Sequence, residues 1–323
     1  MNFAHFIREI GRGKEGARDL EFAEAQQLYG AMLDGGVSDV ELGAIMIALR
    51  MKGEAIEEMA GFMAAVNERL YALDCPRDRI RPVVIPSYNG ARKGANLTPL
   101  MAMLLQRFGI PVLVHGPIEG YGRVTSAQIL REFGILPVTS RVQANQQLKD
   151  GQLTFVPSSV ISPGLAQLLS LRGRLGLRNS AHSLVKMIDP FAGRGLVLAA
   201  ATHPEYLEMM RDLLAKLGVA ALLLRATEGE PVANPKRRPR IEYLHDGAVD
   251  LLFEAEHDSL KSLPHLPEDC DVRSTVDWMR AILSGVHAIP APLANQLACC
   301  LYATGYAEDF NQAKAIVAVD AMA

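Results

Sequence analysis

The sequence predicts an α/β protein, in which a small all-helical N-terminal domain is followed by a large α/β domain with a mostly parallel sheet. Apolar residues recur at helical spacing through residues 2–70, which indicates four consecutive helices. From residue 83 onward, short β-branched runs alternate with segments of helical length, a pattern typical of a parallel sheet built from βαβ units. The length of 323 residues, 49% of them hydrophobic, allows a large core and favours two domains.

The helical domain is expected to span residues 1–73. Its helices are predicted over residues 2–10, 19–33, 38–52 and 56–70. Gly36 and Gly53 lie where the second and third helices are expected to end, as is common for glycine. These helices are too few to form the whole core, and a contribution to this domain is expected from about residues 163–190.

The α/β domain is expected to comprise residues 74–162 and 191–323. Its strands are predicted at residues 83–85, 111–114, 153–156, 196–201 and 219–224. Helices are predicted here at residues 98–108, 126–133, 142–149 and 203–217, and two further helices, at 163–175 and 179–188, fall in the segment assigned to the helical domain. Pro86 and Pro157 end two of the strands, which indicates that the chain leaves the sheet there in loops.

The loop after the first strand, residues 86–96, is predicted to bind an anion. It leaves the carboxyl end of its strand, where open α/β sheets bind ligands. Its glycines and the start of the next helix offer backbone amides that favour anions, and Arg92 and Lys93 add positive charge. We therefore expect this loop to contact phosphate. The alternative is an ordinary solvated loop tip.

Charge is distributed unevenly along the chain. The formal net charge of −3 gives no overall sign of a polyanionic partner. Cations nevertheless cluster within residues 81–131, 171–186 and 236–240, while many acids lie from Asp246 onward. A nearly neutral chain can therefore present a basic face to nucleic acid. The third cluster, Lys236–Arg240, fits either a solvated loop or the rim of a phosphate site.

The cysteines and the apolar runs indicate a cytoplasmic protein. Cys75, Cys270, Cys299 and Cys300 have no CxxC spacing, which favours free thiols in a reducing compartment over disulfides or a zinc site. The N-terminus has no signal-peptide pattern, and no apolar run approaches the ~20 residues of a membrane span. We therefore expect a soluble protein with no membrane partner.

Three segments resemble anthranilate phosphoribosyltransferase: Asp34–Ser38, Ala48–Glu54 and Arg172–Arg178. The order of the predicted elements is similar over nearly the whole chain. The resemblance implies a small helical domain, a large α/β domain, and dimers formed through the helical domain. It also implies an active site that holds phosphoribosyl pyrophosphate and magnesium.

The catalytic motifs of that family are largely missing. Its GTGGD pyrophosphate loop stands here as Pro86–Gly90, in which bulkier residues replace glycines. Its KHGN motif stands as Val114–Pro117 without the lysine, and Glu230–Val232 replaces the acidic pair that binds magnesium. Only Arg172, at the position of the family's anthranilate-binding arginine, clearly remains. We therefore expect no anthranilate transfer, no catalytic residues, no metal and no cofactor.

The remaining scaffold resembles the YbiB-like branch of the same superfamily. The segments that carry this resemblance include Gly11–Lys14, Ile85–Lys93, Arg178–His182 and Thr227–Glu230. The resemblance implies a homodimer whose basic clefts bind DNA or RNA, preferably single-stranded, with little sequence preference, and a role in DNA repair or the stress response. The residues expected to contact nucleic acid or phosphate are Arg12, Lys14, Arg18, Asn89, Gly90, Arg92, Lys93, Asn96, His115, Arg123, Arg172, Arg174 and Arg178.

Other interpretations remain open for the same residues. The anion loop is compatible with a phosphoribosyltransferase or phosphorylase that acts on another base, and also with a sensor of small anions or nucleotides. His115 fits a structural histidine at a strand end as well as a phosphate contact. Tyr88 and Tyr121 could stack on the bases of a single strand.

Overall fold

The computed structural model describes residues 3–13, 15–76, 79–258 and 265–320. The chain forms two compact units: Met1–Tyr71 with Ser158–Ile188, and Ala72–Pro157 with Asp189–Ala323. The first unit is helical and the second is α/β, so the predicted fold class is confirmed. We expected the helical domain to span residues 1–73 with about 163–190, and the α/β domain to span 74–162 and 191–323. These ranges differ from the two units by a few residues at each boundary.

The helical unit contains two groups of helices. The longer helices come from the N-terminal segment: α1 (Phe3–Ile10), α2 (Phe22–Leu33), α3 (Asp39–Lys52) and α4 (Ile56–Asn67). The short ones come from the returning segment: α8 (Ser158–Ile161), α9 (Pro163–Ser170), α10 (Arg172–Leu175) and α11 (Ala181–Leu184). The helices expected at 163–175 and 179–188 are thus wrong in extent. The first is broken at Leu171, and the second is a single turn.

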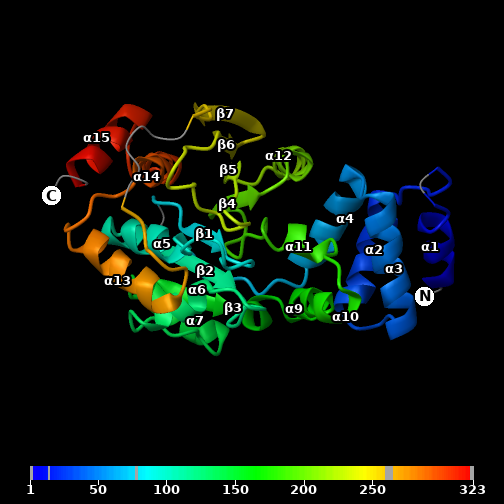
Figure 1. The fold of residues 1–323 in the computed structure, drawn as a ribbon. Coiled ribbons are helices and arrows are strands. Elements are labelled where there is room, and N and C mark those ends of the chain that lie inside the picture. The colour runs from blue at the N-terminus through cyan, green and yellow to red at the C-terminus, as the bar shows by residue number, and fades with distance from the viewer. Residues whose placement is uncertain (1–2, 14, 77–78, 259–264, 321–323) are drawn as a thin grey trace. The chain divides into compact units, whose positions relative to one another are not determined.

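Close packing of α2 on α4 forms the centre of the helical unit (Figure 1). The rings of Tyr29 and Phe62 stack with their centroids 4.5 Å apart, and both side chains are buried. Gly61 permits this approach, because a Cβ at this position would lie 2.5 Å from the carbonyl oxygen of Phe22. Burial of this aromatic pair contributes both hydrophobic area and a favourable ring contact.

A buried acid joins α3 to α4 in the same unit. The carboxylate of Glu58 is fully buried and forms an ion pair with the ammonium of Lys52 at 2.6 Å. It also accepts the backbone N–H groups of Leu20 (2.9 Å) and Ala55 (2.8 Å). Lys52 reaches Asp19 as well, at 2.6 Å. A cation therefore compensates the buried charge here, as burial of an ion requires.

The sheet of the α/β unit has seven strands among the described residues. They are β1 (Val83–Pro86), β2 (Val112–Gly116), β3 (Thr154–Pro157), β4 (Leu196–Ala201), β5 (Ala221–Arg225), β6 (Ile241–His245) and β7 (Ala248–Phe253). Their spatial order is β3-β2-β1-β4-β5-β6-β7, with parallel pairing from β3 to β5 and antiparallel pairing beyond. The five predicted strands are confirmed, whereas the β6–β7 hairpin was not predicted.

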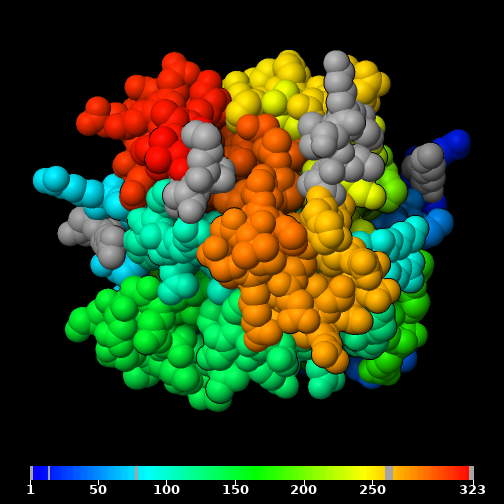
Figure 2. Space-filling model, turned by 60° about the vertical axis from the view of Figure 1, so that its left-hand side comes forward, coloured from blue at the N-terminus to red at the C-terminus, as the bar shows by residue number. Residues whose placement is uncertain are grey.

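Helices cover both faces of this sheet (Figure 1). The helices of the unit are α5 (Thr98–Arg107), α6 (Ser126–Arg131), α7 (Arg141–Lys149), α12 (Pro204–Leu217), α13 (Val272–Leu283), α14 (Ala291–Ala303) and α15 (Phe310–Asp320). Leu196, Leu198 and Ala200 of β4 pack into the same apolar cluster as α5 and α14. The residues that alternate with them point to the opposite face, where α12 packs. Figure 2 shows α15 (red) at the surface near the yellow β6–β7 hairpin, with α13 (orange) below them.

The position of β1 determines where a ligand would meet the sheet. Strand β1 pairs with β2 on one side and with β4 on the other. The order of the strands therefore reverses at β1, and the carboxyl end of such a strand is the usual ligand position in open α/β sheets. The loop predicted to bind an anion starts at this point.

Two further expectations concern the whole chain. Cys75, Cys270, Cys299 and Cys300 form no disulfide bond in the described part of the chain, and burial raises the pKa of Cys300 above its ordinary value. Within the part of the chain that the structure describes, no helix is long and apolar enough to cross a membrane.

Candidate anion-binding site

The carboxylate of Glu230 accepts the first backbone amides of the loop that follows β1. Its Oε1 accepts the N–H groups of Asn89 (2.8 Å) and Gly90 (2.7 Å). Its Oε2 accepts the hydroxyls of Ser87 (2.5 Å) and Thr98 (3.0 Å). Glu230 is only 1% exposed. Four donors thus converge on one buried carboxylate, in the way that such a loop would surround the oxygens of a phosphate.

A second carboxylate, that of Glu228, occupies the outer half of the same loop. Its two oxygens accept the backbone N–H groups of Arg92 (3.1 Å), Lys93 (2.8 Å) and Gly94 (2.9 Å). The guanidinium of Arg123 approaches it at 3.4 Å. Amides from both halves of the loop are therefore satisfied by side chains of the protein itself, which removes the cost of burying free donors.

Both glutamates belong to a tight turn after β5, Thr227–Glu230. Thr227 and Glu230 exchange backbone hydrogen bonds of 3.2 and 3.0 Å across the turn. Glu228 and Gly229 have positive φ angles of 53° and 93°. A Cβ on Gly229 would overlap the side chain of Asn89, so close approach and conformation both require glycine. The turn thereby presents two carboxylates to one loop.

Asn96, Gly90 and Arg123 have structural contacts in this loop. Asn96 is buried; its amide nitrogen donates to Ser126 (3.2 Å), and its oxygen accepts the backbone N–H of Thr98 (3.2 Å) where α5 begins. Gly90 is buried and has a φ of 61°. Arg123 donates to the carbonyl oxygen of Gly90 at 3.0 Å. Three of the residues predicted to contact nucleic acid therefore maintain the shape of the loop.

His115, at the end of β2, is fully buried. Its Nδ1 lies 2.9 Å from the hydroxyl of Tyr88. Burial lowers the pKa of the imidazole from 6.5 to about 3. The ring is therefore neutral at physiological pH and has no charge to offer a phosphate, which agrees with a structural role for this histidine.

Arg92 and Lys93 differ from their neighbours in the loop. Their backbone amides point inward to Glu228, but both side chains are exposed. Among the described residues, neither side chain has an ion pair. The loop thus combines internally satisfied amides with two outward cations, and only the cations are available to a partner.

The remaining candidates belong to the helical unit, and most of them already have acidic partners. Arg12 pairs with Glu9 at 3.3 Å, and Arg18 pairs with Glu9 at 3.3 Å and with Glu24 at 3.1 Å. The pairing with Glu24 raises the pKa of Arg18 and lowers that of Glu24. Lys14 lies outside the described residues. These pairs are exposed and therefore weak, so a polyanion can compete for the arginines.

The arginines of the returning segment differ in their surroundings. Arg174 pairs with Asp39 at 3.0 Å, and both side chains are well exposed. Arg172 and Arg178 act on His182, whose pKa falls to about 3 through burial first and then through repulsion by these arginines. The neutral state of this imidazole therefore reflects burial first and the positive charge of these arginines second.

The residues around the β1 loop do not fit magnesium. Glu228 and Glu230 are engaged by amides, hydroxyls and a guanidinium, whereas Mg²⁺ needs oxygen ligands arranged around it as an octahedron. Of Glu230–Val232, which stands where the family's acidic pair is expected, only Glu230 carries an oxygen ligand in its side chain. Within the described ranges, no group of three or more His, Cys, Asp or Glu side chains could hold a metal.

Glu228 and Glu230 were not among the residues that the sequence analysis selected. Their segment was noted only for its resemblance and for its departure from an acidic pair. The available signal was a Glu-Gly-Glu triplet directly after a strand that lies near the first strand in the sheet. Acids at that edge of the sheet can reach the loop amides as easily as a ligand can.

Comparisons with known proteins agree with this fold. A family model described as the helical bundle domain of a glycosyl transferase family matches residues 4–69. The chain is 43% identical over 318 residues to an Escherichia coli (strain K12) protein named "Uncharacterized protein YbiB", across 98% of this chain and 99% of that protein. It is 24% identical over 315 residues to anthranilate phosphoribosyltransferase of Prochlorococcus marinus (strain MIT 9215), across 94% of this chain and 90% of that protein. The crystal structure of anthranilate phosphoribosyltransferase from Thermus thermophilus matches with a TM-score of 0.74 and 21% identity, across 100% of this chain and 95% of that one.

Proposed function

The chain belongs to the anthranilate phosphoribosyltransferase-like family, and from that premise we propose that it binds DNA or RNA without sequence preference and without catalysis. The preferred partner in this proposal is a single strand. One observation carries the proposal: Glu228 and Glu230 satisfy the amides of the β1 loop, while Arg92 and Lys93 of that loop are exposed. Phosphate recognition then depends on exposed side chains.

Physical chemistry connects this arrangement to a polyanionic partner. Backbone amides around a small cradle select one phosphate or pyrophosphate by shape. Mobile, exposed cations attract phosphates with little selection of shape, and most of the affinity comes from released counterions. Contacts of this kind position a strand without reading its bases. The expected behaviour is therefore binding to any sequence, with a steep dependence on salt.

In the helical unit, Arg172 supports the same proposal most directly. Within the described residues it has no ion pair, and it contributes to the field that lowers the pKa of His182. Arg12, Arg18 and Arg174 have exposed acidic partners and are expected to add less.

A homodimer formed through the helical unit is part of the same proposal. Helix α3 leaves Val40 (83% exposed), Ile47 (36%) and Met51 (71%) open to solvent. Their spacing of seven and four residues places them on one side of the helix. An exposed apolar stripe of this kind favours association. Analytical ultracentrifugation of Met51→Glu tests it: a monomeric variant supports this interface, and an unchanged dimer rejects it.

Fluorescence anisotropy with a labelled oligothymidylate tests the binding function. The titration is carried out at several salt concentrations with wild type and with the double variant Arg92→Ala/Lys93→Ala. The matched control is Arg131→Ala/Lys149→Ala, which removes two exposed cations from helices of the same unit. We expect salt-sensitive binding that weakens only in the first variant. No binding at low salt would reject the proposal.

A phosphoribosyltransferase or phosphorylase that acts on another base is the alternative, because named relatives of the chain are anthranilate phosphoribosyltransferases. The carboxylate of Glu230 stands against it, since it occupies the loop amides. Magnesium-dependent, saturable turnover of phosphoribosyl pyrophosphate would establish the alternative. Absence of turnover with a panel of purine and pyrimidine bases would leave binding as the function.

A further inference from the structure

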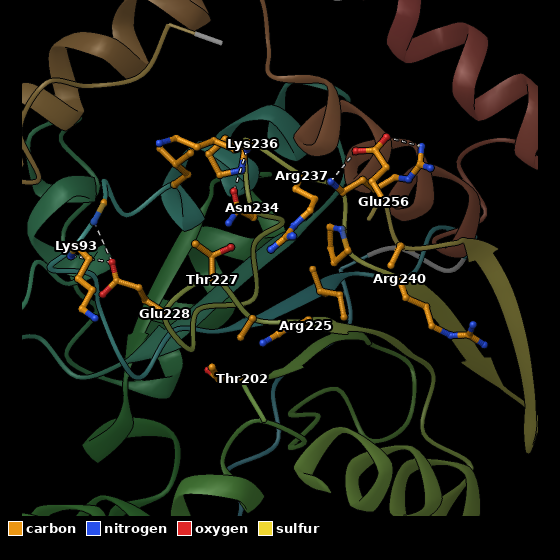
Figure 3. A pocket seen from close by; sticks show the side chains of 18 of the residues that line it. Lys93, Thr202, Arg225, Thr227, Glu228, Asn234, Lys236, Arg237, Arg240 and Glu256 are labelled. Carbon is orange, nitrogen blue, oxygen red and sulfur yellow. Dashed lines mark hydrogen bonds and ion pairs between the residues drawn. The ribbon is translucent and has the colours of Figure 1, made fainter. Parts of the chain in front are cut away.

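The α/β unit contains a second region directed at anions, a pocket beside the carboxyl end of β5 (Figure 3). We call it the β5 pocket; it is bounded by Lys93–Leu97, Leu223–Glu228, Asn234–Arg240, Ala255–His257 and Leu266–Glu268. Its volume is about 890 Å³, within the range of roughly 300–1,000 Å³ that is common for small-molecule sites. Among the described residues that line it, cations outnumber carboxylates by seven to four.

The basic run Lys236–Arg240 contributes to this pocket in two different ways. Arg238 and Arg240 are engaged in holding the loop in place. Arg238 lies over the ring of Phe253 at 4.7 Å and approaches Glu256 at 3.5 Å. Arg240 pairs with Glu242 at 2.9 Å. The charges of these two arginines are therefore largely compensated, and their role is structural.

The other two cations of the run are left to the pocket. Asn234 accepts the backbone N–H of Lys236 at 2.9 Å and the turn continues to Arg237, so both side chains leave a defined turn. Both are exposed, and the guanidinium of Arg237 has only a long contact of 3.4 Å with the carbonyl oxygen of His257. Among the described residues, neither cation has an acidic partner.

Arg225 supplies a third cation from the end of β5. Its neighbours along the strand are buried, while Arg225 itself is exposed and, in the described part of the chain, has no ion pair. Figure 3 shows Arg225, Thr227, Asn234 and Arg237 grouped around the pocket, while Arg240 extends away from them. Two uncompensated cations, Arg225 and Arg237, and two neutral polar side chains thus lie around one space, which Lys236 also lines.

Part of the wall of the pocket is apolar. Leu97, Leu207 and Leu266 line it, together with three prolines. A phosphate alone would leave most of 890 Å³ empty, and an apolar wall gives nothing to an inorganic ion. A ligand with a charged end and a flat organic part matches both surfaces, because cations bind the phosphate and the apolar wall covers the ring system.

We propose that the β5 pocket binds the 5′-phosphate end of a nucleotide, with the base against the apolar wall. Arg225, Lys236 and Arg237 hold the phosphate oxygens, and the side-chain amide nitrogen of Asn234 donates a hydrogen bond. The nucleotide has two possible sources, a free nucleotide or the terminal nucleotide of a strand. The proposed phosphate contacts differ from Arg92 and Lys93, on which the proposed strand binding depends, so this inference does not require that the strand binding is correct.

Isothermal titration calorimetry with adenosine 5′-monophosphate and adenosine 5′-triphosphate tests the free-nucleotide source. Anisotropy titrations of an oligothymidylate with a 5′-phosphate and of the same strand with a 5′-hydroxyl test the strand-end source. Each probe is titrated into wild type, the pocket variant Arg225→Gln/Lys236→Gln, and the matched control Arg131→Gln/Lys149→Gln. All substituted side chains are exposed, so urea denaturation should find equal stability in the three proteins.

We expect wild type and control to bind free nucleotides, or to prefer the 5′-phosphorylated strand, and the pocket variant to bind about tenfold more weakly. A pocket variant that binds like wild type overturns the inference, as does a protein indifferent to both free nucleotides and the 5′-phosphate. If 5′-hydroxyl strands still bind in that case, the proposed function stands without the pocket. If nucleotides bind and strands do not, the pocket stands without the proposed function.

Discussion

The β1 loop and the β5 pocket are neighbours in one unit, but their polar groups are partnered in opposite ways. In the loop, backbone amides and hydroxyls converge on the carboxylates of Glu228 and Glu230, which the protein itself supplies. In the pocket, Arg225, Lys236 and Arg237 line one space, and none of the three has an ion pair among the described residues. The difference shows that anion-binding geometry and anion-binding capacity are separate properties of a site.

The comparison also shows how such a site can lose its ligand without losing its fold. A loop with free amides needs an acceptor, and an internal carboxylate meets this need permanently. The cations on the same loop then have no fixed partner and stay at the surface. A scaffold built around a small phosphate can in this way become one that contacts phosphates only through side chains.

Removing the internal acceptor should have the largest effect. Glu230→Ala leaves two amides and the hydroxyl of Thr98 buried without the acceptor they have in the wild type, and we expect it to lower the free energy of unfolding by about 4 kcal/mol. Glu230→Gln keeps the shape but loses the charge, and should cost about half as much. Urea denaturation measures both, with Glu268→Ala, an exposed carboxylate, as the control.

The same variant sharpens the comparison through added anions. Inorganic phosphate should recover part of the stability of Glu230→Ala, since the vacated amides bind it, and should do so less for wild type. If Glu230→Ala is as stable as wild type, then the carboxylate does not hold the loop, and the contrast with the pocket fails.

The next effect concerns pH and the buried His115 beside the loop. Its pKa in the folded protein is about 3, whereas an unfolded histidine has a pKa near 6.5. Below pH 6.5 the imidazole of His115 therefore binds a proton in the unfolded chain but not in the folded chain, so the free energy of unfolding decreases as the pH falls. Between about pH 6.5 and about pH 4.5 this loss should be about 2–3 kcal/mol.

Urea denaturation of wild type and His115→Gln at about pH 7 and about pH 4.5 isolates this contribution. The variant should lose less stability on acidification than wild type. His182 has the same direction of shift but lies in the helical unit and is present in both proteins, so its contribution cancels. Equal losses in the two proteins would show that His115 is accessible to protons in the folded state.

A smaller effect should show whether the β1 loop binds nucleic acid through its cationic side chains or through its backbone amides. Arg92→Ala/Lys93→Ala removes side chains while keeping the amides that Glu228 accepts. We expect roughly tenfold weaker binding of a single strand, and a slope of log affinity against log salt that is smaller by about 1.4. Arg174→Ala should change the slope less, because Asp39 already pairs with that arginine. If Arg174→Ala changes the slope more than the double variant does, the main contact with nucleic acid lies in the helical unit.

The smallest effect should come from Glu228, which belongs to both regions. Glu228→Gln keeps a carbonyl oxygen for the loop amides and removes a negative charge from the pocket. We expect about threefold tighter binding of nucleotides and strands, with a stability loss of about 1 kcal/mol. Anisotropy and urea denaturation measure the two changes. Weaker binding in this variant would mean that Glu228 acts mainly by holding the β1 loop in shape, and that its negative charge does not weaken binding.

Much of the fold could be predicted because its signals are local. Five strands were predicted from β-branched runs, and α2, α3 and α4 from apolar periodicity, since burial depends on the spacing of neighbouring residues. The β6–β7 hairpin was missed because β7 is largely exposed and lacks an alternating apolar pattern. Its one clear signal was Asp246–Gly247, whose positive φ angles of 48° and 76° suit a hairpin turn.

By itself, the sequence determined that a basic, glycine-containing loop would end the first strand, and that cations would gather in three stretches of the chain. Only the tertiary structure decided which of those groups remain available. Glu230 lies about 140 residues beyond the amides it accepts, and Arg238 and Arg240 find acids on another strand and loop, while Lys236 and Arg237 do not. The physical reason is that hydrogen bonds and ion pairs depend on distances of about 3–4 Å, which folding sets and spacing along the chain does not.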